Sequence, residues 1–149
     1  MGNITIAQIN TALVATLGTA EQLTFKQDAD ALTEGMQDLP TLQVYWENLT
    51  SDALANNADR STFGKGVIVT RLTFHADVYV RQRSHIGENM AAVLELASTV
   101  NDVLEAQTSK PYFGLEGIQA FAYTAERVTF DYGKAAYAGI RFILTITVY

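Results

Sequence analysis

Histidine and aspartate residues near the middle of the chain are the side chains whose types and spacing could do chemistry. His75 and Asp77 share one face of an extended strand, and His85 follows further along. Two imidazoles and a carboxylate could bind a metal ion or transfer protons. A straight strand would place the two imidazoles about 30 Å apart, so a joint site needs a sharp bend. We therefore expect His75 to be an exposed or paired strand residue, with no metal bound.

The other common catalytic patterns are missing from the sequence. The chain has no cysteine, which removes thiolate ligands, cysteine nucleophiles and disulfides. No serine lies in a Gly-x-Ser-x-Gly elbow. Gly64-Lys65-Gly66 lacks the upstream glycine and the following hydroxyl residue of a phosphate-binding loop, which favours a plain turn. We expect neither enzymatic activity nor a cofactor.

Several arginines fall in or beside the predicted strands, most of them at positions that face outward. Arginine suits interface ion pairs with planar carboxylates, but a solvated strand face with cross-strand charge pairs explains the same pattern. A nucleic-acid contact is a third interpretation. The residues are Arg71, Arg81, Arg83, Arg127 and Arg141.

Two helices are predicted from apolar stripes with helical spacing. The first begins at a capping box of Thr5 and Gln8 and ends at Gly18. The second covers residues 86–104, with Glu88 near its positive N-terminus. The stripes consist of Ile6, Ile9, Leu13 and Leu17 in the first helix, and of Ile86, Met90, Val93, Leu94, Ala97, Val100 and Leu104 in the second.

Four strands are predicted from alternating apolar and polar residues. They span residues 42–49, 68–81, 118–131 and 136–149. Residues 51–66 are rich in turn-forming types and predict a long flexible loop between the first two strands. Residues 19–40 carry acidic side chains without periodicity, so we expect a mostly irregular connection there.

The order helix, strand, strand, helix, strand, strand predicts a single α+β domain. We expect a two-layer sandwich in which two helices cover one face of an antiparallel sheet of about four long strands. Trp46 is expected in the core, whereas Tyr45 faces outward and could anchor a contact. The uncovered face is expected to carry an aromatic and apolar patch, typical of an interface. Its members are Tyr79, Phe121, Tyr123, Ile143 and Tyr149.

Charge and hydropathy exclude some partners. The formal net charge of -6 disfavours general binding to nucleic acid, which needs clustered lysine and arginine. No apolar run is long enough to cross a bilayer, and the N-terminus lacks the pattern of a signal peptide. We expect a protein that is made in the cytoplasm and has no membrane partner.

The chain ends with the run Tyr137-Ala-Gly-Ile-Arg-Phe-Ile-Leu-Thr-Ile-Thr-Val-Tyr149. This run can be compared with known families together with the element order, the chain length and the loop at 51–66. Together these features resemble the tail terminator proteins, also called tail completion proteins, of tailed bacteriophages. The resemblance covers nearly the whole chain and rests on pattern, because the family has no catalytic motif to compare.

The resemblance implies a structural virion protein of the tail or neck, assembled in the host cytoplasm. Six copies would form a ring that caps the head-proximal end of the tail tube and joins it to the head-tail connector. Tail tube protein and connector protein would be partners, and double-stranded DNA would pass through the lumen without sequence-specific binding. The loop residues Arg60, Phe63 and Lys65 are candidate contacts with tube or connector.

Two alternative functions stay open. One is another neck or tail-tube subunit of a phage-like particle. The other is a small ligand-binding or enzymatic α+β domain that uses the face of His75, Asp77 and Tyr79.

Overall fold

The computed structural model describes residues 4–20, 23, 25–28, 40–53, 68–82, 90–132 and 135–148. The α-helices are α1 (Ile6–Leu17) and α2 (Met90–Glu105), and a short 3-10 turn, η2, spans Tyr112–Gly114. The strands are β1 (Phe25–Asp28), β2 (Thr41–Ala53), β3 (Ile68–Gln82), β4 (Ile118–Tyr132) and β5 (Ala135–Val148). The predicted α+β class, with two helices and four long antiparallel strands, is confirmed.

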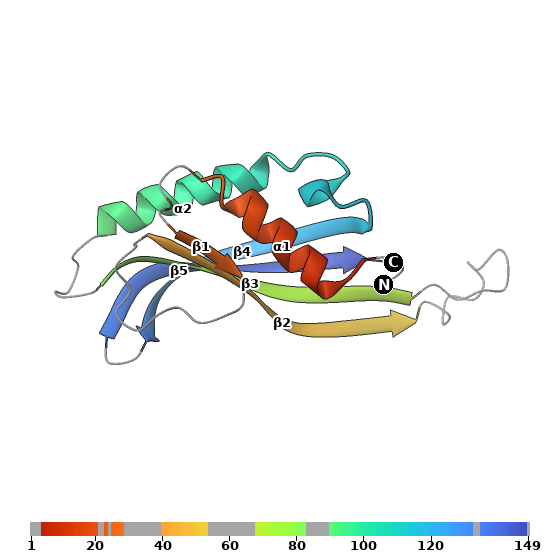
Figure 1. Cartoon of the computed structure of the whole chain (residues 1–149), viewed down its shortest axis with the longest axis horizontal. Helices are drawn as coiled ribbons and strands as arrows, with labels where there is room; N and C mark the ends of the chain where they lie inside the picture. Colours follow the sequence, from red (N-terminus) through yellow and green to blue (C-terminus); the bar gives the residue numbers. More distant parts are fainter. Residues whose placement is uncertain are drawn as a thin grey trace, which may run out of the picture.

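All five strands belong to one sheet, in the order β1-β2-β3-β5-β4. β1 runs parallel to β2, and every other neighbouring pair is antiparallel. Both helices lie over the same face of this sheet (Figure 1). The first helix, α1, contacts β1 and β2, and α2 contacts β3 and β5. We call this side the helix-covered face and the other side the open face, over which the described residues place no helix.

The hydrophobic core fills the space between the helices and the sheet. Its side chains come from both helices and from alternate residues of the three central strands. The fully buried members include Ile9, Leu13, Leu17, Leu42, Leu72, Phe74, Leu96, Leu104, Phe142 and Leu144. The predicted stripe of the second helix is wrong at Leu94, which is 60% exposed, and it omitted Leu96, which is buried.

The predicted start of α1 is confirmed in detail. The backbone N–H of Gln8 donates to Thr5 Oγ1 at 3.1 Å, and the backbone N–H of Thr5 donates to Gln8 Oε1 at 2.8 Å. This reciprocal pair satisfies two N–H groups that the first turn of a helix leaves without partners. For the second helix, the described part begins at Met90, so the predicted first turn with Glu88 lies outside the described residues.

The segment 19–40 was expected to be mostly irregular, but it contains strand β1. Phe25–Asp28 pairs in parallel with Thr41–Val44. Four residues are too few to show an alternating pattern, and polar Lys26, Gln27 and Asp28 follow the single aromatic residue. Parallel pairing with β2 therefore decides the structure where local periodicity gives no signal.

A β-bulge near the start of β4 overturns part of the predicted open face. The register of β4 against β5 shifts at Gln119, which adds one residue to β4. One extra residue reverses the face of every side chain that follows. Phe121 therefore lies opposite Ile146, and Tyr123 lies opposite Leu144, on the helix-covered face. Both aromatic rings pack against the core instead of forming an outward patch.

Candidate functional site

The sheet has two edges beside which the described residues place no further strand. β1 borders β2 only at Thr41–Val44, so the outer side of Tyr45–Ala53 is open. β4 is the last strand on the opposite side along all of Ile118–Tyr132. We call Tyr45–Ala53 the β2 edge and Ile118–Tyr132 the β4 edge. Backbone N–H and C=O groups on such edges can pair with a strand of another chain.

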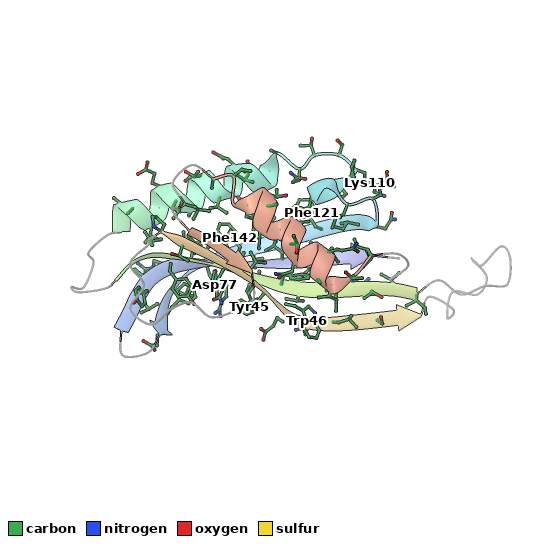
Figure 2. The ribbon with its side chains drawn as sticks, in the orientation of Figure 1. Tyr45, Trp46, Asp77, Lys110, Phe121 and Phe142 are labelled. Carbon is green, nitrogen blue, oxygen red and sulfur yellow. The ribbon has the colours of Figure 1, made fainter. Side chains whose placement is uncertain are left out.

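Large apolar side chains are exposed along the β2 edge. Trp46 is 45% exposed and Leu49 is 40% exposed, and Ile68 on the neighbouring strand β3 is 56% exposed. The prediction that Trp46 belongs to the core is wrong. Val44 on the same face is fully buried, but β1 ends opposite Val44, and no described strand borders the outer side of Trp46, which Figure 2 labels.

Leu49 is a surface residue that sequence reasoning missed. Strict alternation would give Leu49 the same orientation as Tyr45, on the open face. A β-bulge at Glu47 shifts the register, so Leu49 lies opposite the buried Leu72 on the helix-covered face. Bulges leave no reliable pattern in a single sequence, so periodicity alone could not find this position.

A polar network crosses the open face from β2 to β5. Asp77 on β3 is 1% exposed. Arg141 Nε donates to Asp77 Oδ1 at 2.9 Å, and Arg141 Nη2 donates to Asp77 Oδ2 at 3.1 Å. The Tyr45 hydroxyl donates to the same Oδ2 at 2.8 Å and accepts from Arg141 Nη2 at 3.2 Å. The carboxylate is therefore held by a two-pronged guanidinium and by a phenol.

The network changes the titration of its members. Burial, together with the hydrogen bond to Asp77, raises the pKa of Tyr45 well above its usual range. The hydrogen bond to Asp77 also raises the pKa of Arg141, although burial acts in the opposite direction. Tyr45 is thus kept neutral and Arg141 charged at any physiological pH.

His75 lies at the margin of this network. Its Nδ1 is 3.2 Å from the Tyr45 hydroxyl and 3.9 Å from Glu47 Oε2, and the rings of His75 and Tyr45 meet edge to face. This arrangement agrees with the expected paired strand residue. His85 lies outside the described residues, and among those that are described no three metal-ligating side chains lie close enough to hold an ion.

Three aromatic rings form a second cluster at one end of the open face. The Tyr79 ring centroid lies 4.4 Å from that of Phe130 and 6.0 Å from that of Tyr137. Phe130 covers the backbone at Gly139, where an added Cβ would meet its ring at 2.7 Å. The Arg141 guanidinium lies 5.5 Å above the Phe130 ring, within range of a cation–π contact. Aromatic packing therefore joins the polar network to β4.

An open pocket of about 480 Å³ lies between the network and the aromatic cluster. Its walls include Gln43, Thr129 and Asp131 in addition to residues of both groups. Both oxygens of Asp77 are already occupied by Tyr45 and Arg141. The pocket therefore has the volume for a small ligand, but the hydrogen bonds to its central carboxylate leave little room for a metal ion.

The structure places the predicted contact residues in different environments. Arg71 and Arg127 are exposed on β3 and β4. Arg141 forms an ion pair with Asp77. Tyr45 is half-buried in the network, and Tyr79 is buried in the aromatic cluster. Arg60, Phe63, Lys65, Arg83 and Tyr149 lie outside the described residues, as does the side chain of Arg81.

Comparison with known proteins supplies no family for the chain. No family model matches it, and no curated protein is similar enough in sequence to count as a relative. Within the described ranges, no helix has the length and hydropathy needed to cross a membrane.

Proposed function

We propose that this chain is a structural subunit that assembles with copies of itself into a ring, as the tail terminator of a tailed phage. The two long open edges on opposite sides of one sheet carry this proposal. They are two different surfaces, and a ring of head-to-tail contacts needs two different surfaces on each subunit. In this proposal a two-layer sandwich presents its edges to its neighbours.

The ring would contain six copies, cap the head-proximal end of the tail tube and join it to the head-tail connector in the virion. The acidic composition supports this role. A net charge of -6 on each subunit disfavours adhesion to DNA phosphates, so double-stranded DNA could slide through the lumen.

Measuring the mass of the assembly in solution tests the proposal. Light scattering coupled to size-exclusion chromatography should give six times the chain mass of 16.3 kDa, and negative-stain electron microscopy should show closed rings. Purified tail tubes incubated with the protein should carry one ring at one end. A protein that stays monomeric at high concentration and never binds tube ends would contradict the proposal.

Another neck or tail-tube subunit remains the nearest alternative. The same images separate the two, because a tube subunit would stack into filaments of variable length, whereas a terminator stops at single rings.

The pocket beside Asp77 motivates the ligand-binding alternative, and substitution of His75 tests it. His75→Ala should leave ring formation unchanged and lower the free energy of unfolding by about 1 kcal/mol, because it removes only a marginal hydrogen bond to Tyr45. If His75→Ala instead abolished binding of a small molecule found in the purified protein, the ligand-binding function would be favoured.

A further inference from the structure

Each open edge contains one bulge and otherwise lacks the common protections against pairing with another strand. Natural edges are blunted by proline, by lysine, by bulges or by short length. The β2 edge and the β4 edge contain neither proline nor lysine. The β4 edge spans 15 residues, and after its bulge at Gln119 it pairs with β5 without further register shifts. Such an edge is suited to accept a strand along most of its length.

The strand directions fix how the two edges could meet. β2, β3, β5 and β4 alternate in direction, so β2 and β4 of one subunit point in opposite directions. In a head-to-tail row, every copy keeps the same orientation. The β2 edge of one copy would therefore lie antiparallel beside the β4 edge of the next, and the alternation would continue across the boundary.

The faces of the sheet restrict the register of such a pair. Leu49 points to the helix-covered face, opposite buried Leu72. On β4, Tyr123 and Ala125 point to the same face, and Ala125 lies opposite buried Phe142. A continuous sheet needs these faces to match, because a slip of one residue exchanges them. After the bulge at Gln119, Leu49 must therefore face an odd-numbered residue of β4.

One position of the β4 edge complements the β2 edge in size on the helix-covered face. Bulky Trp46 and Leu49 are exposed there on the β2 edge, and small Ala125 is exposed there on the β4 edge, whereas exposed Ala120 and Ala122 lie on the open face. Small residues leave room beside the strand for large apolar side chains of a neighbour, whose burial would add to the backbone hydrogen bonds.

We propose that the β2 edge of one copy pairs antiparallel with the β4 edge of a second copy, so that one sheet continues from subunit to subunit. This inference rests on the proposed function in taking a second copy as the occupant. It names the contact that would hold neighbouring subunits together.

Because the natural chain has no cysteine, introduced cysteines can test the contact by disulfide formation between subunits. Leu49→Cys protein is mixed with protein that carries one cysteine at Tyr123, Thr124, Ala125 or Glu126, and the mixture is oxidised. A disulfide needs Cβ atoms about 4 Å apart. We expect linked dimers containing one chain of each kind, with yields at position 123 or 125 about tenfold above those at 124 and 126.

The single-cysteine proteins serve as matched controls. Linkage that is equal or stronger at positions 124 and 126 would overturn the proposal. Linkage of Leu49→Cys or Ala125→Cys only to a second copy of the same variant would also overturn it, because this result indicates two-fold pairing of like edges. Rings that form without any linkage would overturn this contact and leave the proposed function standing. A monomeric natural chain would instead contradict the proposed function.

Discussion

Asp77 is the one charged side chain that is buried among the described residues, and its partners explain how the sheet tolerates it. A carboxylate taken out of water is costly unless hydrogen bonds and an opposite charge compensate. Arg141 supplies two hydrogen bonds and the charge, and Tyr45 supplies a third hydrogen bond. These residues come from three adjacent strands, so the network also specifies which strands are neighbours.

Arg141→Ala should destabilise the fold strongly. The substitution leaves Asp77 buried with only Tyr45 as partner, and removing one member of a buried pair costs about 3 kcal/mol. Urea denaturation followed by circular dichroism measures the change. Arg127→Ala is the matched control, since Arg127 is exposed on β4 and its loss should cost less than about 1 kcal/mol. Equal effects of the two substitutions would contradict a special role of the network.

Tyr45 should make the fold sensitive to alkaline pH. Its folded-state pKa lies above the ordinary value of 10.0, whereas the unfolded chain ionises near that value. Unfolding therefore releases a proton above pH 10, and the free energy of unfolding should fall as the pH rises from there. Tyr45→Phe should reduce the steepness of this fall, measured by urea denaturation at increasing pH. An unchanged steepness would show that Tyr45 does not retain its proton in the fold.

At the scale of elements, periodicity predicted the structure wherever a long segment packs against the core. The strand at 68–81, the stripe of α1 and the buried Val93, Val100 and Leu104 of α2 were found this way, because one face of each element must be buried. Leu94 was assigned to the buried stripe but is 60% exposed. The wrong faces in the strands have a common physical cause. Bulges at Glu47 and Gln119 changed the faces of Leu49, Phe121 and Tyr123, and a bulge depends on the partner strand, which periodicity cannot see.

Gly139 shows a second constraint that acts between elements. An added Cβ would clash with the backbone oxygen of Val78 and meet the Phe130 ring at 2.7 Å. Gly139→Ala should therefore lower the free energy of unfolding by about 2 kcal/mol through overpacking. Thermal or urea denaturation measures this loss.

Gly117→Ala is the matched control for Gly139→Ala. Its added Cβ would meet side-chain atoms of Ile4 no closer than 3.1 Å, and a side chain can move aside more easily than a strand backbone. A larger loss at Gly117 than at Gly139 would mean that the contact between Phe130 and β5 is loose.

At the scale of the whole molecule, the sequence predicted an interface on the uncovered face of the sheet, whereas the contact proposed from the structure lies at the edges of the sheet. Their outward strand positions predicted Arg141 and Tyr79 as contact residues, but Arg141 pairs with Asp77 and Tyr79 packs on Phe130 within the same subunit. The open edges depend on strand order, which is a property of the complete sheet. Exposed Trp46 and Leu49 were hidden for the same reason, because their exposure follows from where β1 ends and where β2 bulges.

A lysine placed on the β4 edge should therefore block assembly without unfolding the subunit. Ala125→Lys puts a charge on an exposed position of that edge, where a neighbouring strand would have to desolvate it. We expect the dissociation constant of the assembly to rise at least about tenfold, which corresponds to about 1.4 kcal/mol for each contact. Analytical ultracentrifugation over a range of concentrations measures it, with circular dichroism as the check on folding.

Ala91→Lys provides the comparison, because it adds the same charge at an exposed site in the first turn of α2, away from both edges. It should leave the assembly intact and change stability by about 0.5 kcal/mol at most. If both variants assemble like the natural chain, neighbouring copies must meet through surfaces other than these edges. If both fail to assemble, added charge itself prevents association. Loss with Ala125→Lys alone identifies the edge of the sheet as the surface that subunits share.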